Sequence, residues 1–178
     1  MSIYDLKSLH LPKLTGSLFK LFTAAVEMAV CMQQYKKHRN KQGAPVRLNL
    51  AIGEALTAMD YLQAQRMRTR AMNNFNKVFS EVDVILTPAT AKIAQPFLTG
   101  GLKGGWTDLS LDTEMMRFII PGILLGLPAL SFPSGYDVRG LPIGMQTIGR
   151  HWEQNLLLRV AYNAEQVVER KLPKFYFS

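Results

Sequence analysis

Apolar residues recur at steps of three, four and seven in four segments of the chain, a spacing that places them on one face of an α-helix. The predicted helices cover residues 17–37, 57–79, 112–125 and 152–168, the third starting at Asp112 or Thr113. In the second, Thr57 and Asp60 fit a capping box, in which a hydroxyl accepts a hydrogen bond from the N3 amide. In the third, Pro121 and Gly122 predict a kink or a break.

Two of these helices have a stripe that we expect to be buried. In the second helix the stripe is Tyr61, Ala64, Ala71, Phe75 and Val78. In the last helix it is Trp152, Leu156, Val160, Ala164 and Val168.

Three short apolar runs between the helices, rich in β-branched residues and bounded by proline or glycine, are typical of buried strands. They cover residues 82–88, 129–133 and 143–148, and residues 134–142 have the composition of a turn between the last two. Helices alternating with short strands predict an α/β fold, a mixed β-sheet flanked by helices. Three strands are few for four covering helices, so the pattern also predicts an incomplete part of a larger domain.

Two connections are predicted to be loops. Residues 38–45 are polar and basic, and residues 96–110 contain Pro96 and two glycine pairs. The glycines at 100–105 lack the spacing of a phosphate-binding loop, which favours a pliable surface loop.

The net charge of +8 on 178 residues permits attraction to anionic partners. Its basic residues are spread over the chain, with one cluster at residues 36–41 and another at residues 66–70. No zinc-finger spacing or RNA-binding aromatic motif accompanies them, so we expect a solvated basic surface and no nucleic-acid partner. The longest apolar run, residues 18–32, is interrupted by polar residues and is shorter than the roughly 20 residues of a spanning helix. We expect a location in the cytoplasm or at the periphery of a membrane.

Candidate reactive side chains are isolated from one another in the sequence. Ser131 and Ser134 have no nucleophile-elbow motif around them, and Cys31 lies on an apolar helix face. His10, His38 and His151 stand alone, and for His151 a surface or capping role is favoured. One cysteine and three scattered histidines provide no metal-site spacing. We predict no catalytic residue, no metal and no cofactor for this chain.

Several motifs in order resemble the C-terminal portion of the amidase signature family. They begin with Asp60-Tyr61-x-x-Ala64-Gln65 and the run from Val82 to Pro88, followed by Met116-Arg117-Phe118. Leu125-Gly126-Leu127-Pro128-Ala129, Pro133-x-Gly135 and the stretch from Gly140 to Gln146 come next. The first and third motifs are most similar to fatty acid amide hydrolases of the plant-like branch. Two positions depart from the family pattern: Ile123 stands where asparagine is common, and Ala89 where threonine is usual.

The resemblance implies an enzyme that hydrolyses N-acylethanolamines or other fatty amides without a cofactor. The family's serine, second serine and lysine lie in a glycine- and serine-rich segment that these 178 residues do not contain. The chain would then supply scaffold and acyl channel, and be inactive alone. In this branch the helix matching residues 112–125 lines the acyl channel, so the implied substrate-binding residues are Thr113, Met116, Ile119 and Ile120. The alternative is that these side chains are simply core.

The resemblance divides the chain at residue 55. Residues 1–54 form a poorly matched N-terminal helical segment, and residues 55–178 form the C-terminal part of an amidase domain. Two protein partners remain candidates: a second copy of the chain in a homodimer, or a complementing N-terminal half. A rival hypothesis is a non-catalytic lipid-binding or interaction module whose first helix and basic tail lie on an anionic membrane. A third is a truncated product that barely folds alone.

Overall fold

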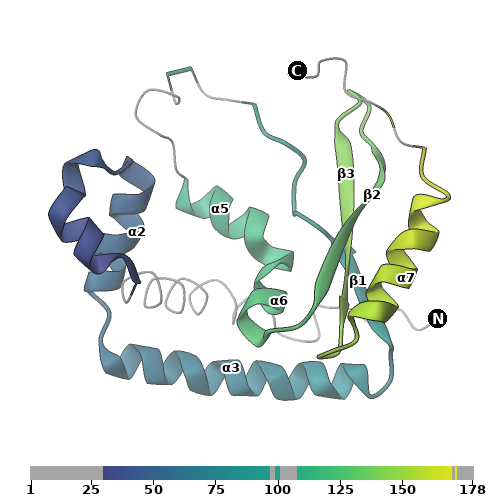
Figure 1. Ribbon diagram of the computed structural model, residues 1–178, viewed down its shortest axis with the longest axis horizontal. Coiled ribbons are helices and arrows are strands. Elements are labelled where there is room, and N and C mark those ends of the chain that lie inside the picture. Colours follow the sequence, from purple (N-terminus) through teal and green to yellow (C-terminus); the bar gives the residue numbers. More distant parts are fainter. Residues whose placement is uncertain (1–29, 97–98, 101–107, 170, 172–178) are drawn as a thin grey trace.

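The computed structural model describes residues 30–96, 99–100, 108–169 and 171 (Figure 1). Residues 30–38 are helical. The elements that follow are η2 (Arg39–Lys41), α2 (Ala44–Glu54), α3 (Ala58–Phe79), β1 (Val84–Pro88), α5 (Leu109–Met115), η3 (Met116–Phe118), α6 (Ile120–Leu125), β2 (Ala129–Tyr136), β3 (Pro142–Gly149) and α7 (Gln154–Glu165). The α/β class predicted from the sequence is confirmed.

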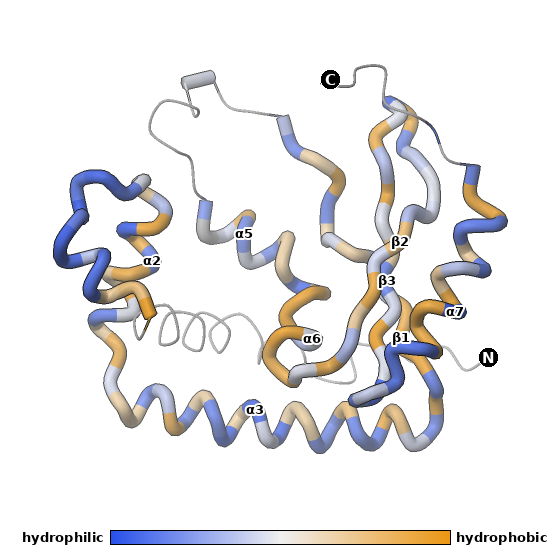
Figure 2. Tube along the Cα trace, in the orientation of Figure 1, coloured by the Kyte–Doolittle hydropathy of each residue, from blue (hydrophilic) through white to orange (hydrophobic). Residues whose placement is uncertain are grey.

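The strands form one sheet in the order β1-β3-β2, and both pairings are antiparallel. Helix α7 lies against one face of β2 and β3, while α3 and α6 lie on the other side (Figure 1). Hydrophobic residues are concentrated along α6 and the strands (Figure 2). The core contains Ala71, Phe75, Val78, Phe79, Ile85, Ile120, Leu124, Leu125, Leu127 and Ile148.

Strand β2 and strand β3 are joined by the predicted turn. The Asp137 carboxylate accepts hydrogen bonds from the amides of Arg139 and Leu141, and Gly140 has φ +83°. A positive φ is the conformation in which glycine has no side-chain penalty, which explains its place here. The aspartate and glycine pattern therefore predicted this hairpin correctly.

Helix α3 begins with the predicted capping box, in which Thr57 Oγ1 accepts from the Asp60 amide and Asp60 accepts from the Thr57 amide. Four members of its expected stripe are buried, from Ala64 to Val78. Tyr61, the fifth, is 39% exposed, so its predicted burial was wrong. The reason is that the first turns of α3 extend beyond the sheet (Figure 1).

The predicted helix 112–125 starts earlier than expected, and its predicted break is confirmed. It starts at Leu109, because the Asp108 carboxylate accepts hydrogen bonds from the amides of Ser110 and Leu111. The break is the 3-10 turn η3, upstream of Pro121. Proline has no amide hydrogen for the carbonyl four residues earlier, so the helix gives way one turn before it.

Three other expectations need correction. Trp152, expected in the buried stripe of the last helix, is 89% exposed with φ 69°, because α7 begins only at Gln154. The other four residues of that stripe are partly buried. The predicted loop 38–45 contains η2 and the first turn of α2, whose N-terminal proline suits a helix start. Of the predicted loop 96–110, residues 109–110 belong to α5 and most of the rest lies outside the described residues.

The N-terminal expectations are only partly visible. Of the predicted helix 17–37, residues 30–37 are described and are helical, and the earlier part lies outside the described residues. None of the helices within the described ranges is both long and apolar enough to cross a bilayer.

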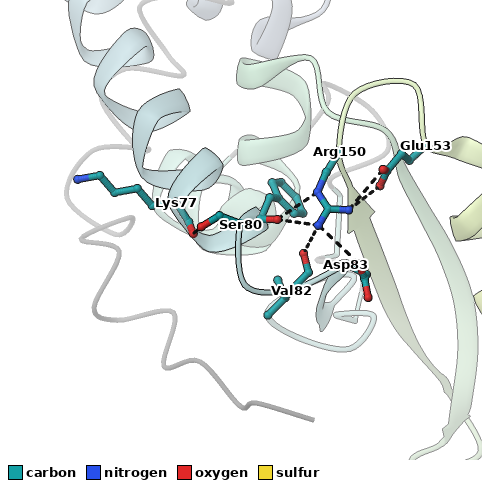
Figure 3. Close-up of polar contacts among 7 residues, drawn as sticks. Lys77, Ser80, Val82, Asp83, Arg150 and Glu153 are labelled. Atoms are coloured by element: carbon teal, nitrogen blue, oxygen red, sulfur yellow. Dashed lines mark hydrogen bonds and ion pairs between the residues drawn. The ribbon is translucent and has the colours of Figure 1, made fainter.

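Arg150, directly after β3, joins four parts of the fold (Figure 3). Its Nε and Nη2 donate to the Phe79 carbonyl at the end of α3, at 3.1 and 2.7 Å. Nη2 also donates to the Val82 carbonyl ahead of β1, at 2.9 Å. Nη1 pairs with the carboxylate of Glu153 ahead of α7, at 3.2 Å. The planar guanidinium thus satisfies the carbonyl groups where α3 turns into β1.

We predict that Arg150→Lys lowers the free energy of unfolding by about 2 kcal/mol, because an ammonium cannot reach both carbonyl groups and the carboxylate, and buried carbonyls lose their partners. Urea unfolding of the 178-residue chain measures this. The matched control is Arg159→Lys on the exposed side of α7, expected within about 0.5 kcal/mol of wild type. Equal losses for the two variants would contradict the bridging role of Arg150.

The Asp60 carboxylate generates a second prediction. Hydrogen bonds from the Thr57 hydroxyl and amide lower the pKa of Asp60 below its ordinary value of 3.8. A lowered pKa stabilises the fold fully above the ordinary value, and this contribution is lost as the pH falls through the folded-state pKa. The stability difference between wild type and Asp60→Asn should therefore shrink as the pH falls below about 4. Denaturant titrations from pH 7 to 3 measure it, with Glu54→Gln as an exposed-carboxylate control; a pH-independent difference would refute it.

Candidate functional site

The break between α5 and α6 brings three apolar side chains into one row. The Ile119 amide donates to the Met116 carbonyl at 2.9 Å, which closes the 3-10 turn. Residues three apart eclipse in a 3-10 turn, so Met116 and Ile119 lie above one another. The Ile123 amide donates to the Ile119 carbonyl, so Ile119 and Ile123 share one face of α6. We call Met116, Ile119 and Ile123 the apolar row.

Exposure decreases along this row from Ile123 to Met116, which packs against the core beneath it. Ile123 is 50% exposed, and Met116 and Ile119 are half-buried. Ile120 is only 1% exposed and belongs to the core, as does Leu124 one turn later. Of the four sequence-predicted substrate residues, Met116 and Ile119 thus come together, and half-buried Thr113 lies one turn earlier. Ile120 is therefore a core residue, as the alternative to a substrate-binding role predicted.

Sequence reasoning missed Ile123 as a site residue. It was noted only as a departure from the family pattern, whereas its exposure makes it the most accessible member of the apolar row. The signal that was available is the spacing from Met116 through Ile119 to Ile123, which is one step of three and one of four.

A buried polar contact attaches this segment to the sheet. Gln146 of β3 is 4% exposed, and its Nε2 donates to Thr87 Oγ1 at 2.9 Å and to the Phe118 carbonyl at 2.6 Å. Thr87 is equally buried and donates to the Pro88 carbonyl at 3.0 Å. The two partners of Gln146 thus lie at the end of β1 and in η3.

Two polar side chains contact the C-terminal end of α6. Arg68 Nε of α3 donates to the Leu124 carbonyl, and His151 Nε2 lies 3.1 Å from the Leu125 carbonyl oxygen. Gly126 ends the helix with φ 70°. These contacts satisfy carbonyl groups that a helix end leaves free. His151 is exposed, as expected, but the helix end that its ring contacts is that of α6 and not the start of the last helix.

A cavity of about 390 Å³ opens beside the same helix end. It is lined by Asn76, Phe79, Ser80, Leu127, Arg150 and His151. An anion would need free donors from Arg150, yet its guanidinium already serves two carbonyl groups and the carboxylates of Glu153 and Asp83. Arg150 in this lining is therefore engaged in holding the fold together.

Two of the candidate reactive groups contact the backbone. Ser134 Oγ donates to the Ile143 carbonyl at 3.1 Å, and His151 is engaged with α6 as described. Across residues 30–96, 99–100, 108–169 and 171, no three His, Cys, Asp or Glu side chains come together as a metal site requires. Within these residues the candidate site is the apolar row together with its attachment to the sheet.

The family model described as Amidase matches residues 11–158. The chain belongs to the amidase family. The match begins upstream of residue 55, where the recognisable motifs start. The amidase chain is 44% identical over 133 residues to a fatty acid amide hydrolase of Medicago truncatula, covering 74% of this chain and 22% of that protein.

Other relatives carry a different name, and solved structures share the fold. A glutamyl-tRNA(Gln) amidotransferase chain of Pelagibacter ubique is 33% identical over 146 residues, covering 79% of this chain and 29% of that protein. A crystal structure of an amidase superposes with a TM-score of 0.73 at 25% identity, covering 86% of this chain and 36% of the other. The chain thus spans less than a third of the length of these curated relatives.

The inward and outward sides of α6 give a direct prediction. Ile120→Ala should lower the free energy of unfolding by about 2–5 kcal/mol, because it opens a cavity in the core. Ile123→Ala removes the same atoms from an exposed position and should cost about 0.5 kcal/mol or less. Thermal and urea unfolding of both variants measure the difference. A cost for Ile123→Ala as large as that for Ile120→Ala would mean that the apolar row is core.

Proposed function

We propose that this amidase chain supplies the scaffold and acyl-binding surface of an enzyme that hydrolyses fatty amides such as N-acylethanolamines. The nucleophilic serine, second serine and lysine of the family would come from another stretch of protein. In that reaction the serine attacks the amide carbonyl, the amine leaves, and water releases the fatty acid from the acyl-enzyme. The contribution of this chain is to bind the acyl tail.

The observation that carries the proposal is the partly exposed apolar row, with Ile123 at 50% exposure, on a segment attached to the sheet. Met116, Ile119 and Ile123 offer thioether and methyl groups, which suit an alkyl chain. Each methylene that such a surface buries contributes about 0.8 kcal/mol. A row three side chains long therefore favours long acyl groups over short ones.

The second named group of relatives raises glutamine as an alternative amide donor. Recognition of a glutamine requires placed donors and acceptors for its charged and polar groups. The apolar row has none of these on its three side chains, so it favours the fatty amide. The plant relative named fatty acid amide hydrolase, at 44% identity, supports the same choice.

We predict that the purified 178-residue chain alone shows no hydrolysis of N-lauroylethanolamine above background. Co-expression with the part of the Medicago truncatula fatty acid amide hydrolase that precedes the matched segment should restore it. In this complex Ile123→Glu should lower kcat/KM for the lauroyl amide by about tenfold or more and leave a short-chain amide unaffected, because a carboxylate replaces apolar contact with the tail.

The matched control is Met59→Glu on α3. Met59 is an apolar side chain of similar size, is 61% exposed and lies far from the apolar row in the sequence. It should change neither substrate. Turnover by the chain alone would refute the supply of the nucleophile from elsewhere. Preference of the complex for glutamine, or equal loss on both substrates in Ile123→Glu, would refute the fatty-amide assignment.

A further inference from the structure

Gln146 joins three elements through a single amide group. It belongs to the central strand β3, and its Nε2 donates to Thr87 Oγ1 of β1 and to the carbonyl of Phe118 in η3. Both amide hydrogens therefore have an acceptor. Thr87 in turn donates to the Pro88 carbonyl, so the contacts form a connected chain of hydrogen bonds. Such chains strengthen their members by mutual polarisation.

The cost of this arrangement indicates that it has a role. Gln146 lies on the sheet face that packs against α3 and α6, two residues from Ile148 of the core. Placing an amide there requires that its hydrogen bonds be satisfied, since each unsatisfied buried group costs about 1–3 kcal/mol. An apolar residue in the strand would incur no such cost. Stability alone therefore does not require glutamine at this position.

The Phe118 carbonyl is the point through which the glutamine acts on the apolar row. Phe118 lies between Met116 and Ile119, in the turn where the helix is interrupted ahead of Pro121. Apolar packing is non-directional and leaves such a turn free to shift along the sheet. A short hydrogen bond from a buried strand is directional and fixes the turn in one register.

We propose that Gln146 is a positioning residue for acyl recognition, which holds Met116 and Ile119 in line with Ile123 through the Phe118 carbonyl. This assignment rests on the proposed function, because the ligand it serves is the acyl tail. Gln146 itself does not contact the tail. Its effect is to preserve the shape of the apolar row and thus the affinity for a long acyl group.

The sheet offers matched variants for a test. Gln146→Leu removes both donors at nearly constant volume. Thr87→Val removes one acceptor and leaves the Phe118 contact in place. Thr147→Val is the control, because this neighbouring threonine is fully buried and its hydroxyl has no hydrogen-bond partner among the described residues. In Gln146→Asn the amide is kept, but the side chain is too short to reach both partners. This variant replaces Gln146→Leu in the test if Gln146→Leu does not fold.

The experiment is NMR of the 178-residue chain with ¹³C-methyl methionine, titrated with N-lauroylethanolamine. We expect Gln146→Leu to displace the Met116 methyl resonance in the free chain and to raise the apparent Kd by about tenfold, an effect of about 1.4 kcal/mol. Thr87→Val should have a smaller effect, and Thr147→Val none. Met72 on α3, which packs against the core, reports general loosening and should stay unchanged.

Two results would overturn the assignment. The first is an unchanged Met116 resonance and Kd in Gln146→Leu. The second is displacement of the Met72 resonance as large as that of Met116, which would indicate general destabilisation. A wild-type chain whose Met116 does not respond to the amide would refute the proposed ligand and this role with it. In that case displacement of Met116 in ligand-free Gln146→Leu would still establish the attachment of η3 to the sheet.

Discussion

The guanidinium of Arg150 is the contact on which the arrangement of the helices around the sheet depends. It donates hydrogen bonds at the turn from α3 into β1, to the carbonyl groups of Phe79 and Val82, where the regular bonding of the helix has ended. Because it also pairs with Glu153 ahead of α7, one side chain joins the helices on both faces of the sheet. Packing of the core against α3 and α6 then follows from this fixed geometry.

The segment from α5 to α6 illustrates how one amphipathic stretch serves two purposes. Its inward side, with Ile120 and Leu124, completes the core, and its outward side leaves Ile123 half exposed. The 3-10 turn between the two helices allows this division, because it rotates the chain and brings Met116 into line with Ile119. Gln146 then attaches the turn to the strands. Exposed row and core are thus two sides of the same helix.

The sheet itself has room for neighbours, in keeping with a chain that spans less than a third of its curated relatives. Helix α7 packs on β2 and β3, whereas Leu86 of the outer strand β1 remains 45% exposed. Among the described strands β1 pairs only with β3, so its other edge has unpaired backbone groups. Such an edge favours the addition of another strand or a covering segment. The incomplete sheet expected from the count of strands and helices agrees with this geometry.

Local patterns in the sequence were sufficient for the capping box at Thr57, the three strands and the hairpin at Gly140, because each depends on residues adjacent in the chain. They were insufficient for Tyr61 and Trp152, whose helical spacing says nothing about whether another element covers them. The partners of Arg150 and Gln146 lie between 28 and 71 residues away, apart from Glu153. Only the tertiary structure decides such contacts, since separation along the chain does not specify proximity in space. The same holds for Ile120 and Ile123. Both are isoleucines, and only their surroundings in the fold make the first a core residue and the second a surface residue.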